Sequence, residues 1–125
     1  MTSLPPLIIV WYKRDLRVSD HAPLSHAIEH AKQSGAKLIA FYSFEPSVTN
    51  APDFSAFHRQ FIEESLRDLA KSLTSIGISL VIRSSEIIEC LEEFRSQYRL
   101  ISLYSHEETG NHITYMRDKE VAKYL

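Results

Sequence analysis

Hydrophobic residues form a continuous run over residues 7–12, and they dominate residues 38–44 and 100–104, each of which contains a single serine. The runs are rich in β-branched and aromatic side chains, as in the sequence Leu-Ile-Ile-Val-Trp-Tyr of the first. Runs of this kind are typical of strands that are buried on both faces, as in the centre of a parallel sheet. We therefore expect three such strands, and a shorter one over residues 78–83.

The segments between these strands carry hydrophobic residues at helical spacing. In the first segment, Leu24, Ile28 and Ala31 lie on one helical face, with Asp20 as the expected N-cap and Gly35 as the stop.

A longer helix is predicted after the second strand, preceded by Phe57 and Phe61 and closed by Gly77. Its hydrophobic residues follow one another in steps of four and three, at Ile62, Leu66, Leu69, Leu73 and Ile76. Two more helices are expected, one capped by Ser85 with its apolar face at Ile87, Leu91, Phe94 and Tyr98, and one that begins at Asn111.

Alternating strands and helices predict right-handed βαβ units in an α/β fold. We expect a Rossmann-like doubly wound parallel sheet with three αβα layers and the strand order 3-2-1-4. A fifth strand would complete the sheet. Residues 121–125 lie in a helical pattern without a stop signal. We therefore expect residues 1–125 to be one truncated domain, although a C-terminal helix that frays there is an alternative.

The composition is that of an ordinary globular domain, with 44% hydrophobic and 24% charged residues. The formal net charge is −2, so the basic excess that grips a phosphate backbone is lacking. We expect any DNA-binding surface to lie in another part of the protein.

The single cysteine, Cys90, excludes an internal disulfide and suits a reducing compartment. The N-terminus lacks the basic region of a signal peptide, and residues 7–12 are too short a run to cross a bilayer. A cytoplasmic domain without membrane contact is expected.

Ligands of open parallel sheets bind beyond the carboxyl ends of the strands, where the strand order reverses. At that place the fold brings together two charged loops, residues 13–17 and 105–111, and the second strand's end at Phe44 and Glu45. We expect the binding crevice between them.

The number and positions of the glycines indicate which class of ligand the crevice can bind. The chain has only three, and two of them, Gly35 and Gly77, are expected to end helices. Neither Gly-x-Gly-x-x-Gly nor a P-loop is present, which disfavours ATP and dinucleotides. A flat heteroaromatic molecule fits better, because aromatic side chains such as Phe44 or Trp11 can pack on its face while carboxylates accept hydrogen bonds from its ring N–H groups.

Three segments carry a family resemblance. Residues 10–24 read Val-Trp-Tyr-Lys-Arg-Asp-Leu-Arg-Val-Ser-Asp-His-Ala-Pro-Leu, which closely resembles the opening of DNA photolyases and cryptochromes. Residues 61–69, Phe-Ile-Glu-Glu-Ser-Leu-Arg-Asp-Leu, are similar to a helix of that family. Residues 105–118, beginning Ser-His-Glu-Glu-Thr-Gly-Asn, resemble the form found in a bacterial branch.

This resemblance implies a light-dependent flavoprotein. Members repair cyclobutane pyrimidine dimers or (6-4) lesions with blue light and reduced FAD, or act as light receptors. Their N-terminal α/β domain often holds an antenna chromophore, which is a folate, deazaflavin, lumazine or flavin. FAD and damaged DNA bind a helical C-terminal domain, which would be the partner of this one. No catalytic residue is expected here, and the chain alone should not repair DNA.

By position, the resemblance also implies candidate antenna ligands. His58 lies where several relatives place a basic residue, next to Arg59. The other candidates are Lys13, Phe44, Glu45, Glu107, Glu108, Gly110 and Asn111.

Simpler interpretations compete at several positions. Arg14, Asp15 and Arg17 are expected to form a loop ion pair that holds the first strand to the missing domain. A general acid–base role for Glu107 or Glu108 is disfavoured, because no nucleophile is suggested nearby.

The histidines of the first helix, His21, His26 and His30, are expected to be solvated and not to bind a metal, because no third ligand is apparent. Trp11 is expected in the core, and Cys90 is expected to be inert.

Three functional alternatives stay open beside the repair domain. They are a cryptochrome-type blue-light photoreceptor domain, a stand-alone Rossmann-like nucleotide-binding or sensory module, and a scaffold that only packs on the helical domain.

Overall fold

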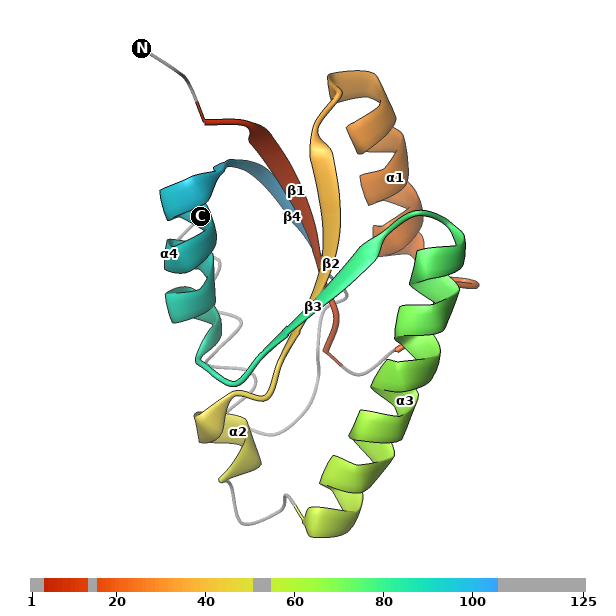
Figure 1. Cartoon of the computed structure of the whole chain (residues 1–125), viewed down its shortest axis with the longest axis vertical. Coiled ribbons are helices and arrows are strands. Elements are labelled where there is room, and N and C mark those ends of the chain that lie inside the picture. The colour runs from red at the N-terminus through yellow and green to blue at the C-terminus, as the bar shows by residue number, and fades with distance from the viewer. Residues whose placement is uncertain (1–3, 14–15, 51–54, 106–125) are drawn as a thin grey trace.

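The computed structural model describes residues 4–13, 16–50 and 55–105. A four-stranded parallel sheet has the order β3-β2-β1-β4, which confirms the predicted order (Figure 1). Its strands are β1 (Pro6–Trp11), β2 (Lys37–Ser43), β3 (Ser79–Arg83) and β4 (Arg99–Tyr104). The helices are α1 (Ala22–Ser34), α2 (Pro46–Thr49), α3 (Ala56–Ser75) and α4 (Ile87–Gln97). The helix predicted from Asn111 lies outside the described residues.

Strand β1 is paired on both edges. Ile9 lies opposite Ile39 of β2 and Leu103 of β4. Every β1 residue from Leu7 to Trp11 is buried, as expected for the centre of a parallel sheet.

The sheet is covered on both faces, so the fold has three layers (Figure 1). Alternate residues of β1 point to opposite sides. Ile8 and Val10 pack with α1 and α3 through side chains such as Leu24 and Leu69. Leu7, Ile9 and Trp11 pack with Ile87, Leu91 and Phe94 of α4, which confirms Trp11 as a core residue.

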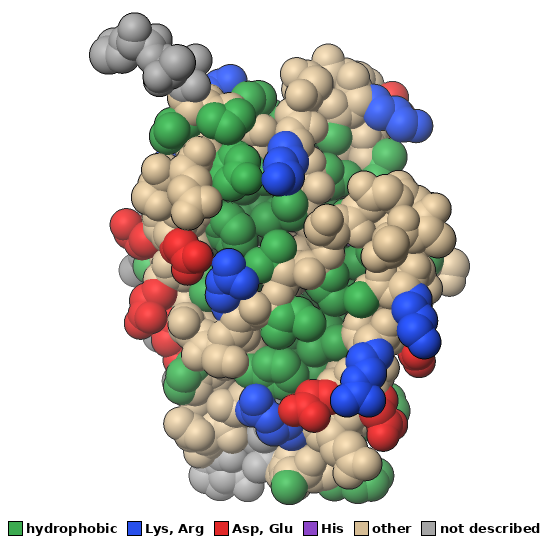
Figure 2. Space-filling model, in the orientation of Figure 1, with side chains coloured by type: hydrophobic (Ala, Val, Ile, Leu, Met, Phe, Trp, Pro, Cys, Tyr) green, Lys and Arg blue, Asp and Glu red, His purple; other side chains and the backbone are tan. Residues whose placement is uncertain are grey.

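Strand β3 lies at one edge of the sheet. On the side of the molecule that β3 crosses, hydrophobic side chains form a central band with charged side chains mostly along its borders (Figure 2). Ile82 of β3 is 42% exposed. Arg83 at the end of this strand forms an ion pair with Glu93 of α4 at 3.5 Å, and charged residues of this kind discourage edge-to-edge pairing.

The start of α1 differs from the prediction. His21, not Asp20, is the N-cap, and its Nδ1 accepts a hydrogen bond of 3.1 Å from the Leu24 N–H. Asp20 has a φ of 51°, in the left-handed region. The His21 ring is only 3% exposed and lies 4.8 Å from the Tyr12 ring, so the expectation of a solvated histidine was wrong. An N-cap residue usually has an extended backbone, which His21 has with φ −129° and ψ 95°, whereas Asp20 does not.

Tyr12 holds the following loop. Burial raises the pKa of Tyr12 to about 12, so its hydroxyl stays protonated and donates to the Arg17 carbonyl at 3.1 Å. Arg17 in turn donates to the carbonyls of Ser19 and Asp20. Its described contacts therefore shape its own loop. Arg14 and Asp15, the other members of the predicted ion pair, lie outside the described residues.

The short helix α2, which begins after Glu45, is not among the helices predicted from the sequence. The N-cap of α4 is Glu86 rather than Ser85. Gly35 and Gly77 follow the ends of α1 and α3 as predicted, with φ of 71° and 80°, values that glycine adopts without strain.

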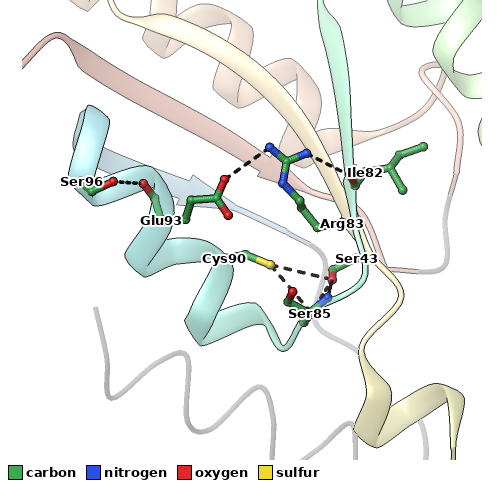
Figure 3. A network of polar contacts seen from close by, with 7 residues as sticks. All are labelled: Ser43, Ile82, Arg83, Ser85, Cys90, Glu93 and Ser96. Atoms are coloured by element: carbon green, nitrogen blue, oxygen red, sulfur yellow. Dashed lines mark hydrogen bonds and ion pairs between the residues drawn. The ribbon is translucent and has the colours of Figure 1, made fainter.

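Cys90 of α4 packs against the sheet and is 2% exposed. Its Sγ lies 3.9 Å from the Ser43 Oγ and 3.8 Å from the Ser85 carbonyl oxygen (Figure 3). Burial raises the pKa of the Cys90 thiol, and the nearby carboxylates of Glu45 and Glu93 also raise it, whereas the hydrogen bond with Ser43 and the charge of Arg83 act in the opposite direction. A thiol in this environment is a weak nucleophile at neutral pH.

None of the helices in the described ranges has both the length and the apolar composition needed to cross a membrane.

The His21 cap predicts a pH-dependent stability. Burial and then the Arg17 charge lower the pKa of His21 from its ordinary 6.5, so the unfolded chain binds the proton more tightly than the folded one. The stabilisation is fully present above about pH 6.5 and is lost as the pH falls through the lower folded pKa. Urea unfolding at about pH 7.5 and 5 should show that His21→Asn, which keeps a cap acceptor, loses less stability than the wild type. Equal losses in the two proteins would contradict this role of His21.

The burial of Cys90 predicts a protected thiol. A disulfide reagent should modify the native chain at least about tenfold more slowly than the chain unfolded in urea, because the reagent reaches the thiolate only after local opening. Absorbance of the released thiol measures both rates, and the single cysteine makes the signal unambiguous. Equal native and unfolded rates would show that the thiol is accessible.

Candidate functional site

All four strands are parallel, so their carboxyl ends lie at one edge of the sheet. The chain moves outward from β1 through β2 to β3, and then returns through α4 to β4 on the other side of β1. The strand order therefore reverses between β1 and β4, and this is where an open α/β sheet binds its ligands. The residues that follow β1, β2 and β4 form the candidate site.

Lys13 follows β1 and lies on the α4 side of the sheet. Its Nζ is 4.8 Å from the centre of the Trp11 ring, a cation–π distance. Trp11 itself is 3% exposed. Lys13 thus places a positive charge at the end of β1, over the ring of the buried Trp11.

Phe44 follows β2 and lies on the opposite side, toward α1 and α3. Its ring is 7% exposed and makes an edge contact with Tyr42 at 5.1 Å between ring centres. The guanidinium of Arg59 lies 4.4 Å from the centre of the Phe44 ring, and its Nε donates to Glu63 at 3.2 Å. One face of Phe44 is therefore covered by a cation from α3.

His58 lies in the first turn of α3. Its backbone N–H donates to Ser55 Oγ at 3.2 Å, and its Nδ1 accepts from the Ser55 N–H at 3.4 Å, which forms a capping box. The next residue, Arg59, contacts the end of β2 through the Phe44 ring. His58 was the residue predicted for the site, with Arg59 named only as its neighbour.

Glu45 is 2% exposed and lies on the same side as α4. Its Oε2 accepts a hydrogen bond of 3.2 Å from the backbone N–H of Ile87, the first residue of α4. A buried carboxylate requires such partners, because transfer out of water without them costs several kcal/mol. The carboxylate thus takes part in the start of a helix.

The two serines beside this carboxylate join the end of β2 to the start of α4 (Figure 3). The Ser85 N–H donates to Ser43 Oγ at 3.2 Å, and the Ser43 hydroxyl donates to the Ser85 carbonyl oxygen. Sequence reasoning missed this pair, because serines in strands and turns carry no pattern that predicts a partner 42 residues away.

The structure thus divides the described candidates between the two faces of the sheet. Lys13 and Glu45 lie on the α4 side, whereas Phe44, with Arg59, lies on the side of α1 and α3. The remaining candidates, Glu107, Glu108, Gly110 and Asn111, fall outside the described residues.

Two of the histidines on α1 also differ from each other. His26 is exposed, as expected, but His30 is half-buried and its Nδ1 lies 2.9 Å from the hydroxyl of Tyr104 at the end of β4. The solvated role predicted for His30 was wrong because the partner comes from a distant strand. Within the described ranges, no three His, Cys, Asp or Glu side chains are grouped so that they could hold a metal ion.

Known proteins show the same fold. A bacterial class III photolyase from Agrobacterium tumefaciens superimposes with a TM-score of 0.73 at 23% identity, over 99% of this chain and 24% of that one. At this identity the likeness establishes the fold.

Sequence relatives come from both branches of one family. A cryptochrome DASH of Gloeobacter violaceus is 31% identical over 121 residues, which are 92% of this chain and 23% of that protein. A deoxyribodipyrimidine photo-lyase of Alkalihalophilus pseudofirmus is 26% identical over 100 residues, 79% of this chain and 20% of the relative. The chain thus spans about a quarter or less of the length of these relatives.

The profile of the DNA photolyase family matches residues 8–125, which is nearly the whole chain. The resemblance predicted from the three sequence segments is confirmed, and the chain belongs to the DNA photolyase family, in which photolyases and cryptochromes are its relatives.

Proposed function

We propose that this chain is the N-terminal antenna-chromophore domain of a light-dependent DNA-repair flavoprotein of the deoxyribodipyrimidine photolyase type. The proposal rests on the match of the family model to residues 8–125. It is supported by the sheet, because charged and aromatic residues follow the carboxyl ends of the strands where the strand order reverses. In this proposal, residues 1–125 form one domain of a longer protein.

The other parts of the repair reaction belong to the rest of the protein. FAD and damaged DNA bind the helical C-terminal domain, which packs on this one. The net charge of −2 supports this division, because a surface that binds a phosphate backbone needs a basic excess. The lyase activity, which splits carbon–carbon bonds of the lesion, therefore needs the whole protein.

The described residues fit a flat heteroaromatic chromophore with polar or anionic substituents. Lys13 and Arg59 bring positive charge to the ends of β1 and β2, while Trp11 and Phe44 beneath them are apolar and rigid. We propose the following residues as the antenna site: Lys13, Phe44, Glu45, His58, Glu107, Glu108, Gly110 and Asn111. A folate, deazaflavin, lumazine or flavin bound there would absorb near-UV or blue light and pass the excitation energy to FAD.

A blue-light photoreceptor is the second candidate function. It is favoured by the names of the relatives, because the cryptochromes DASH of Gloeobacter violaceus and Synechocystis, at 31% and 27% identity, both exceed the Alkalihalophilus photo-lyase at 26%. The two functions share the antenna domain. An assay of light-dependent repair of a cyclobutane dimer by the full-length protein distinguishes them, because repair supports the photolyase function and its absence supports the photoreceptor.

The proposal predicts a second chromophore in the full-length protein purified from its native host. Its absorption spectrum should contain a near-UV or blue band in addition to the bands of FAD. Lys13→Met should lower chromophore affinity about tenfold, because the pocket loses a charge contact worth about 1.4 kcal/mol. Titrations with folate, deazaflavin, lumazine and flavin measure this change.

Lys71→Met is the matched control, because Lys71 is exposed near the end of α3 that leads toward the amino end of β3. It should leave the affinity unchanged. Tight ATP binding without affinity for any of the four chromophores would instead support a nucleotide-binding module and contradict the antenna function.

A further inference from the structure

Two turns at the carboxyl end of the sheet run side by side. Residues 43–47 lead from β2 into α2, and residues 83–87 lead from β3 into α4. The Phe44 N–H donates to the Arg83 carbonyl at 2.8 Å, which extends the pairing of the two strands into the turns. The bonds between Ser43 and Ser85 continue it (Figure 3).

Glu86 occupies the N-cap position of α4, but among the described residues its side chain makes no capping bond to that helix. Its carboxylate reaches across to the other turn. Oε1 accepts from the Ser47 N–H at 2.7 Å and Oε2 accepts from the Ser47 hydroxyl at 2.8 Å. Glu86 therefore caps the first turn of α2.

Glu45 is placed in the reverse arrangement. It occupies the N-cap position of α2, and within the described chain its side chain does not cap that helix. Its Oε2 accepts from the Ile87 N–H at 3.2 Å, in the first turn of α4. Each glutamate thus belongs to one turn and caps the helix that begins at the other.

The two caps support each other. A helix of four residues does not form alone in water, so α2 depends on contacts from outside it. A carboxylate at a helix N-terminus satisfies a backbone N–H and interacts favourably with the helix dipole. If either turn moves, both helices lose a cap, because each turn supplies one acceptor and receives one.

We infer that Glu45 and Glu86 form a reciprocal capping clamp that fixes the turn after β2, and that both are positioning residues for the antenna site. This purpose rests on the proposed function, since the clamped turn follows directly on Phe44 and the Arg59 contact. Among the site candidates, Glu45 would then act by holding the turn next to Phe44 in place, because its carboxylate already accepts the hydrogen bond from the Ile87 N–H.

Hydrogen exchange by mass spectrometry on the full-length protein tests the clamp. Glu86→Ala should raise the exchange rate of residues 46–50 about fivefold, the effect of losing a helix cap. It should also raise exchange at the start of α4, which Glu86 does not cap. Glu45→Met, which keeps roughly the size of the buried side chain but removes its acceptor oxygens, should affect the same two segments.

Reciprocity is read from the double variant. Its exchange should hardly exceed that of the stronger single variant, because the first change already opens both turns. Glu92→Gln, an exposed change further along α4 and outside its first turn, is the control and should change neither segment. Faster exchange only in the segment whose own cap was removed, with additive effects in the double variant, would overturn the clamp.

Chromophore binding tests the positioning role. In the full-length protein, Glu86→Ala should weaken binding about fivefold, while Glu86→Gln, which keeps an acceptor oxygen, should stay within about twofold of the wild type. Folate, deazaflavin, lumazine and flavin are titrated in turn. Unchanged affinity despite faster exchange would overturn the positioning role. If the wild type binds none of the four, the antenna function fails, and the exchange data alone still decide whether the clamp exists.

Discussion

The burial of β1 on both faces, between two hydrogen-bonded neighbours, is the constraint on which the rest of the structure depends. Its residues from Leu7 to Trp11 are hydrophobic and buried, so both faces of the strand must be covered. With β2 on one edge and β4 on the other, the connections have to pass over opposite faces of the sheet. The order of the strands then reverses beside β1, which places the candidate site.

The period of two along each strand decides which candidates share a surface. Trp11 and Lys13 follow one parity along β1 and face α4, while Tyr12 faces the other layer. Along β2, Glu45 faces α4 and Phe44 faces away from it. A chromophore that contacts both Lys13 and Phe44 therefore has to lie across the carboxyl end of the sheet, not against one face.

Much of the fold could be predicted from the sequence, because the signals are local. The hydrophobic runs of β1 and β2, the helical spacing from Leu66 to Leu73 and the stop at Gly35 each depend on a few adjacent residues. The alternation of these elements restricts the sheet to few topologies, and the parallel order followed.

The polar contacts of the site could not be predicted in the same way. Glu86 and Ser47 are 39 residues apart, and no periodic pattern connects a carboxylate to a helix that begins on another strand. The His21 ring lies beside the Tyr12 ring, and Arg59 of α3 lies over the Phe44 ring at the end of β2. Such contacts are products of the tertiary fold, whereas the family motifs identified the loops in which they occur.

We propose that the carboxyl ends of β1, β2 and β4 together hold a light-absorbing heteroaromatic molecule. A crystal structure of the full-length protein, purified with the chromophores it acquires in its native host, tests this most directly. We expect a second chromophore in addition to FAD, across the ends of these strands and in contact with Lys13 or with the Phe44 and Arg59 pair. A second chromophore bound elsewhere, or FAD alone in a protein fully loaded with its native cofactors, would contradict it.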